Sequence, residues 1–168
     1  MDYLTSQGVA TLGTRLRRLL DRMDRDVVAL YRGAGTGFEP RWYPVFAVLR
    51  DEGPLSVGAL ARRLGVTHAA VSQVRAALEA EGLITAMPDP ADRRSQHLAL
   101  TPRGLDMARR LQPLWAAFAA AGAALLAEGA PNLMADLDGL DRALDRCGLR
   151  ARVEQGFDAQ SLNKETPQ

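Results

Sequence analysis

The stretch "LSVGALARRLGVTHAAVSQVRAALEAEGLI", residues 55–84, decides the fold. It predicts two short helices, because Ser56 can cap a first helix that runs to Leu64 and Thr67 can cap a second one. Gly65, which lies between them, can take the left-handed conformation that ends a helix. A connection this short rules out antiparallel packing, so the two helices should cross at a steep angle.

The side chains of this stretch fit such a crossing. Ala61 is small where the helices approach each other, and Val71 fills the angle from the second helix. The other apolar positions should supply the buried remainder: Leu60, Leu64, Val66, Val74 and Leu78. This spacing of small, glycine and β-branched residues is typical of a helix-turn-helix that binds DNA. The alternative is an ordinary helical hairpin that shares part of the pattern.

A small β-hairpin is expected next. Residues 84–87 and 97–100 are two short segments with alternating apolar and polar residues, and Leu98 and Leu100 share one face. Thr101 can then cap a new helix with Pro102 at its first position, where a missing N–H costs nothing. A hairpin in this place turns the helix-turn-helix into a winged one.

The loop of this hairpin concentrates charge. It reads "DPADRRSQ", residues 89–96, and places Arg93 and Arg94 directly after Asp92. An arginine that enters a narrow minor groove gains from the focused negative potential there. Asp92 can hold one edge of the Arg94 guanidinium and so fix its direction. The alternative is an exposed loop with a weak ion pair.

Helical periodicity continues on both sides of this region. A first long helix carries one apolar stripe, formed by Leu12, Leu16, Leu19, Met23, Val27 and Leu30. Residues 40–50 indicate a second helix. After Pro102, a long helix keeps a stripe that reaches Leu125, and residues 130–132 break it. A final helix ends near Gly148 and should turn four leucines inward: Leu133, Leu137, Leu140 and Leu144.

The outer helices carry more apolar surface than a three-helix winged domain can bury. We therefore expect a mainly α fold, with a winged helix-turn-helix domain, a small β-hairpin wing and N- and C-terminal helices that form a dimerisation region. The expected boundaries are 1–37 for the N-terminal dimerisation helix and loop, 38–104 for the winged region, 105–148 for the C-terminal dimerisation helices and 149–168 for a partly ordered tail.

Composition sets the remaining limits. The 168 residues are 47% hydrophobic with a net charge of +1, as in an ordinary soluble protein. A single cysteine, Cys147, excludes an internal disulfide framework. We expect no signal peptide, and the alanine-rich tract at residues 115–127 reads as too weakly apolar to span a membrane. These features predict a cytoplasmic protein, and no motif calls for a cofactor or a metal.

Together, the helix-turn-helix and "DPADRRSQHLALTPRG" resemble the multiple-antibiotic-resistance regulator (MarR) family of bacterial winged-helix repressors. The usual wing of that family, Asp-x-x-Asp-Arg-Arg-x-x-x-Leu-x-Leu-Thr-x-x-Gly, is matched by Asp89, Asp92, Arg93, Arg94, Leu98, Leu100, Thr101 and Gly104. The resemblance covers residues 38 to about 115. It implies a homodimer that binds a palindromic operator, an Asp92–Arg94 pair in the wing, and a response to amphipathic aromatic acids. One departure is Gln73, which stands where many members have arginine.

The second helix should present its outer side to double-stranded DNA. Gln73 can bridge the N6 and N7 atoms of adenine, and Thr67 lies where backbone N–H groups favour a phosphate. For His68, a role as an ordinary solvent-facing residue is an equal alternative. The full set of DNA-binding candidates is Ser56, Thr67, His68, Ala69, Ser72, Gln73, Arg75, Arg93 and Arg94.

Two further hypotheses concern ligands and competing functions. Trp42, Tyr43, Phe46 and Trp115 could line an effector cleft, although aromatic residues at helical spacing are more often core. An enzyme is disfavoured, because His68 and His97 lack a nearby nucleophile motif or metal-ligand spacing. A winged-helix adaptor that binds protein is the other alternative, but an adaptor has no need of the basic wing.

Overall fold

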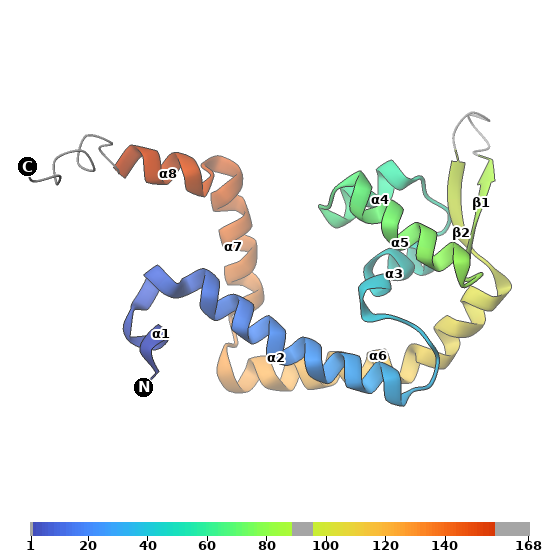
Figure 1. The fold of residues 1–168 in the computed structure, drawn as a ribbon, viewed down its shortest axis with the longest axis horizontal. Helices are drawn as coiled ribbons and strands as arrows, with labels where there is room; N and C mark the ends of the chain where they lie inside the picture. Colours follow the sequence, from blue (N-terminus) through green and yellow to red (C-terminus); the bar gives the residue numbers. More distant parts are fainter. Residues whose placement is uncertain (1, 89–95, 157–168) are drawn as a thin grey trace, which may run out of the picture. The chain divides into compact units, whose positions relative to one another are not determined.

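The computed structural model describes residues 2–88 and 96–156. The chain divides into two compact units, Met1–Gln112 and Pro113–Gln168, and each is described by itself. Figure 1 shows the order of the helices and strands along the chain. The four boundaries expected from the sequence stay a prediction.

The first unit begins with a helical segment that the sequence analysis missed. Helix α1 (Tyr3–Ser6) and a 3-10 turn (Gly8–Thr11) precede the predicted long helix, α2 (Leu12–Gly33). Asp2 caps α1 by accepting a 2.9 Å hydrogen bond from the Thr5 backbone N–H, and it also pairs with Arg18 of α2 at 2.6 Å. One apolar side of α2 is open to solvent, with Leu12, Leu16, Leu19, Leu20, Met23 and Leu30 all exposed.

The winged region follows the predicted order. A 3-10 turn (Pro40–Trp42) leads into α3 (Tyr43–Glu52), and α4 (Val57–Leu64) and α5 (His68–Ala80) come next. Strands β1 (Ile84–Pro88) and β2 (Gln96–Leu100) pair antiparallel, with Ile84 opposite Leu100. Leu55 adds a bridge that the sequence did not predict, because its N–H and C=O both bond to Leu98 at 3.1 and 2.8 Å. This bridge ties the start of α4 to the hairpin.

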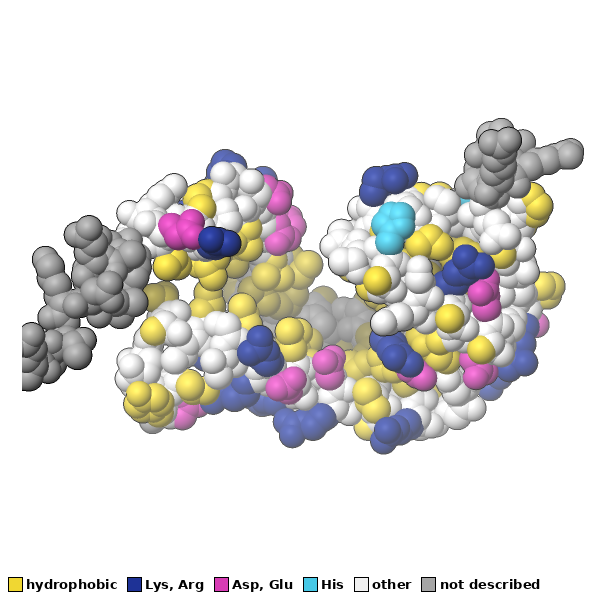
Figure 2. All heavy atoms as spheres, turned by 45° about the horizontal axis from the view of Figure 1, so that its top comes forward, with side chains coloured by type: hydrophobic (Ala, Val, Ile, Leu, Met, Phe, Trp, Pro, Cys, Tyr) yellow, Lys and Arg dark blue, Asp and Glu magenta, His cyan; other side chains and the backbone are white. Residues whose placement is uncertain are grey.

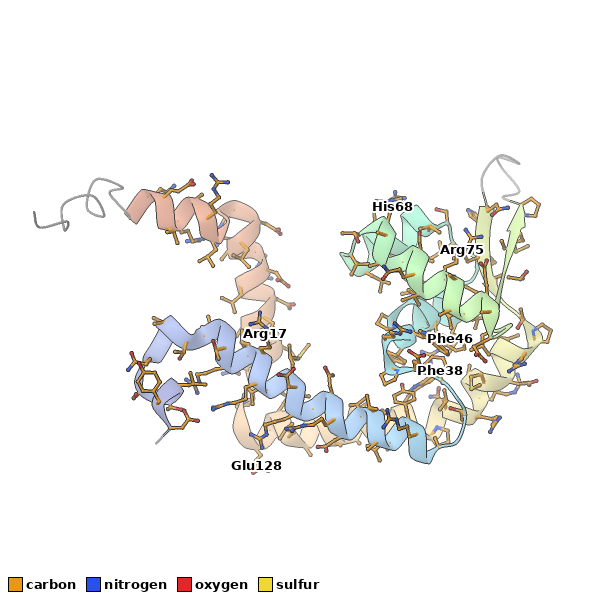
Figure 3. All side chains as sticks on the ribbon, in the orientation of Figure 1. Arg17, Phe38, Phe46, His68, Arg75 and Glu128 are labelled. Atoms are coloured by element: carbon orange, nitrogen blue, oxygen red, sulfur yellow. The ribbon has the colours of Figure 1, made fainter. Side chains whose placement is uncertain are left out.

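The core of this unit joins all of these elements. Its most deeply buried side chains are Phe46, Leu60, Val71, Leu78, Leu83, Leu98 and Leu111. An aromatic cluster lies beside them: Phe38 stacks on Tyr31 and meets Trp42 and Phe46 edge to face, with ring centroids 5.1–5.8 Å apart. Such pairs add to the energy of simple burial. Figure 3 shows Phe38 and Phe46 close together beneath α5.

One core position predicted between α4 and α5 is wrong. Val66 is 45% exposed, because the residue before it, Gly65, is left-handed (φ 64°) and turns the chain outward before α5 begins. Leu105, near the start of helix α6 (Pro102–Gly129), is also exposed. Further along α6, three apolar positions are buried: Ala108, Leu111 and Trp115.

The described part of the second unit consists of helices and the short breaks between them. Helix α6 (Pro102–Gly129) continues into it, and α7 (Leu133–Arg146) and α8 (Leu149–Gly156) follow. The break between α6 and α7 falls at the predicted place, whereas α8 was expected only as a partly ordered tail. The four α7 leucines do not face inward within the single chain, because all are at least 36% exposed.

Helix α6 is long and apolar enough to cross a membrane by length and composition alone, with a mean hydropathy of 1.2 over 18 residues. By these two criteria, the expectation that residues 115–127 are too weakly apolar to span a membrane is not met. Only 11% of that window is buried in the single chain. The finding that matters for function is an uncovered apolar surface.

Candidate nucleic-acid interface

Local hydrogen bonds set the angle between α4 and α5. The Ser56 hydroxyl accepts from the Ala59 N–H at 3.2 Å, and the Thr67 hydroxyl accepts from the Ala70 N–H at 3.2 Å. Gly65 ends α4 in the left-handed conformation that glycine adopts most easily. Each feature was predicted from the sequence, and together they fix where α5 starts.

Helix α5 has one buried and one exposed side. Val71 and Leu78 are 1% and 0% exposed, and they seat the helix on the core. The opposite side is open to solvent and carries His68, Ala69, Ser72, Gln73 and Ala76. This arrangement is what a helix needs in order to enter a major groove, because its polar side chains are free while its position is fixed from behind.

Arg75 lies on a different side of α5. Its Nε pairs with Glu79 Oε1 at 3.0 Å, and its Nη2 donates to Gln96 Oε1 of β2 at 3.5 Å. The side chain is only 30% exposed. In this structure Arg75 joins the helix to the loop end of strand β2, and its candidate contact with DNA stays a prediction.

The root of the hairpin is held by Thr101 and Gly104. The Thr101 hydroxyl donates to the Gly82 carbonyl at 2.7 Å and accepts from the Gly104 N–H at 3.0 Å, so it caps α6 as predicted and anchors the turn after α5. A Cβ atom at Gly104 would overlap with the Leu83 carbonyl oxygen. The close approach of α6 to this carbonyl therefore requires glycine.

The four charged residues that the wing prediction rests on are Asp89, Asp92, Arg93 and Arg94. All four lie outside the described residues, so the orienting role of Asp92 stays a prediction.

Two adjacent arginines on α4 were not among the candidates. Arg63 binds Glu52 with both Nε and Nη2 at 2.7–3.0 Å, and this hydrogen bonding raises the pKa of Arg63. Arg62 is exposed and forms no ion pair with any residue from 2–88 or 96–156. The sequence alone does not show which of the two arginines forms an ion pair, because both are expected on a solvent-exposed side of the helix.

The comparisons with known proteins agree with this geometry. Residues 36–95 match the model of the MarR family. The winged-helix part of this chain is therefore similar to proteins of the MarR family. That family consists of transcriptional regulators, so the resemblance read from the wing motif is confirmed. No curated protein matches the sequence significantly.

Solved structures extend the similarity beyond the winged segment. A probable transcriptional regulator from Pseudomonas aeruginosa is 27% identical, with a TM-score of 0.55 over 79% of this chain and 98% of that one. BpsR from Bordetella bronchiseptica, whose DNA binding is regulated by 6-hydroxynicotinic acid, is 24% identical with a TM-score of 0.62 over 86% and 98%. PcaV from Streptomyces coelicolor, solved with its natural ligand, is 24% identical with a TM-score of 0.59 over 84% and 94%. For BpsR and PcaV, which are both 24% identical to this chain, the comparison shows similarity of fold.

The aromatic residues suggested for an effector cleft lie mostly in the core. Phe46, Trp42 and Trp115 are buried, and Tyr43 is 38% exposed. The indole Nε1 of Trp42 is buried and has no hydrogen-bond partner among the described residues. An unsatisfied buried donor is costly, so this atom would gain from an acceptor. A nearby cavity of about 370 Å³ is lined by Val28, Tyr31, Arg32, Gly37, Phe38, Glu39 and Pro40.

Proposed function

We propose that this chain is a sequence-specific, DNA-binding transcriptional regulator without enzymatic activity. The observation that carries the proposal is the two-sided α5, in which Val71 and Leu78 are sealed in the core while Ser72 and Gln73 face solvent. Gln73 would read adenine and Ser72 would contact a neighbouring base, since both residue types bond to base edges in the major groove. A DNA partner also implies a cytoplasmic location.

The proposal is tested by selecting bound fragments from genomic DNA with the purified chain. We expect the selected fragments to share one short sequence that is protected by the protein in footprinting. Fragments without a common sequence would show that the chain does not bind sequence-specifically.

We further propose that the functional form is a homodimer that binds a palindrome. One recognition helix reads only a few base pairs, and two helices separated by about 34–36 Å would reach successive turns of the major groove. The apolar sides of α2 and α7 are exposed in the single chain, and a second copy would cover them.

An aromatic acid is proposed as the effector. The buried Trp42 N–H lacks an acceptor within the described part of the chain, and a carboxylate or ring hydroxyl would supply one. We would titrate the protein with 6-hydroxynicotinic acid and related aromatic acids while following tryptophan fluorescence and DNA affinity. Saturable quenching with loss of DNA binding supports an effector site, and Trp42→Phe should weaken this response. DNA affinity unchanged by every acid would contradict the proposal.

A further inference from the structure

Two basic side chains from different helices converge over a glycine at the outer end of the α4–α5 pair. A Cβ atom built on Gly58 would lie 3.2 Å from His68 Cε1 and 3.5 Å from His68 Nε2. The same point is 3.6 Å from Nη1 of Arg62. Glycine therefore lets the edge of the imidazole ring lie close against α4, next to the guanidinium. Figure 3 labels His68 at the start of α5, and Figure 2 shows a histidine in cyan at the surface.

No described residue neutralises the charge of Arg62 and His68. Neither Arg62 nor His68 has a hydrogen bond or an ion pair to a carboxylate among the residues whose structure is described. Glu52 of α3 and Arg63 of α4 line the same pocket as Arg62, and they bind each other. On α5 itself, Arg75 is paired with Glu79. Arg62 and His68 are thus left to face solvent together.

We propose that Arg62 and His68 form a binding site for one phosphate group of the DNA backbone. This proposal rests on the proposed DNA-binding function and assigns a position to α5 on the duplex. Ser72 lies one helical turn along from His68, so a phosphate held over Gly58 places the candidate base-reading residues beside the adjacent groove. The phosphate oxygens accept from Arg62 Nη1 and from His68 Nε2, which donates more strongly as part of an imidazolium.

Protonation therefore controls the strength of this site. Histidine is the residue type that ordinarily changes its charge between about pH 5 and pH 8. When His68 gains a proton, the site carries two positive charges in place of one. DNA binding by the chain should then strengthen as the pH falls, and the effect should depend on His68.

The experiment measures binding of a random-sequence duplex by fluorescence anisotropy at about pH 6 and about pH 8. We expect wild-type affinity to be about three- to tenfold higher at the lower pH. The slope of log K against log salt should also be steeper at the lower pH, because protonation adds a positive charge to the site. His68→Gln should remove both differences.

The chain supplies matched controls. It contains only two histidines, so His97→Gln should keep the wild-type response to pH. Arg62→Gln should weaken binding and flatten the salt slope, whereas Arg63→Gln changes an arginine already bound to Glu52 and should do so much less.

The outcomes separate this site from the wider function. A His68→Gln variant that keeps the full pH response, or equal losses in Arg62→Gln and Arg63→Gln, would overturn the phosphate site. Tight binding of inorganic phosphate without DNA, measured by calorimetry and lost in Arg62→Gln, would assign the site to free phosphate and also overturn it. A wild-type chain that binds no duplex at either pH would instead refute DNA binding itself.

Discussion

Single residues fix the angle between α4 and α5 and the close approach of α6 to the turn after α5. Ser56, Gly65 and Thr67 were predicted because caps and left-handed glycines leave a local signature. Gly104 entered only through the family resemblance, because its reason lies in the Leu83 carbonyl, which is distant along the chain. The convergence of Arg62 and His68 over Gly58 could not be predicted either, since it depends on how two helices cross.

Gly104→Ala should destabilise the fold. The new methyl group would collide with the Leu83 backbone oxygen, and a backbone shift of this kind costs about 1–3 kcal/mol in free energy of unfolding. Urea denaturation followed by circular dichroism measures the loss. Gly122→Ala is the control in the same helix, because nothing lies within 4 Å of its Cβ position. A Gly104→Ala protein as stable as wild type would contradict the close approach.

The Asp2 cap should depend on pH. The Thr5 backbone N–H, followed by the Arg18 guanidinium, lowers the pKa of Asp2 from 3.8 to about 2. A carboxyl group with a lowered pKa stabilises the folded state above its ordinary range, and this contribution disappears as the pH falls towards 2. An NMR titration of the Asp2 carboxyl should therefore have its midpoint near 2 in wild type and higher in Arg18→Gln. Equal midpoints in the two proteins would show that Arg18 does not lower the pKa of Asp2.

At the scale of elements, periodicity predicted the helices well and their surroundings less well. Helices α2 to α7 and both strands lie where the pattern placed them, because each has a clear apolar period and a cap or breaker. Helix α8 and the α1 turn were missed because short polar helices lack that period. The Leu55 bridge was missed because two hydrogen bonds from one residue leave no pattern.

The wing makes a separate prediction. Arg94→Ala should weaken DNA binding at least several-fold at moderate salt, because a minor-groove arginine contributes to affinity and not to the core. The melting temperature should stay near that of wild type. Anisotropy titrations and thermal unfolding measure the two quantities on the same samples. Unchanged affinity would exclude Arg94 from DNA recognition.

At the scale of the whole molecule, the unexplained feature is apolar surface without a cover. Sequence periodicity located the stripes on α2, α6 and α7, but it could not say what covers them. Several leucines on α2 and α7 are exposed in the single chain, including Leu19, Leu140 and Leu144. Burial of such stripes between two copies gives the symmetric assembly that a palindrome requires.

Light scattering at micromolar concentration should give a mass twice that of the 18.2 kDa chain. Leu140→Arg should shift the equilibrium towards monomer, because an unpaired charge in an apolar interface is costly. Asp138→Arg is the matched control, an added arginine on the same helix outside the leucine stripe. A wild-type monomer at this concentration would contradict the dimer.

The most direct test of the account compares wild type with the double variant Ser72→Ala, Gln73→Ala. Affinities are measured for a genomically selected fragment and for a random duplex of the same length, at one salt concentration. We expect the variant to keep its stability and its affinity for the random duplex. Its preference for the selected fragment should fall at least tenfold, because specific base contacts are removed. A variant that still prefers the selected fragment as strongly as wild type does would show that the exposed side of α5 does not read the DNA.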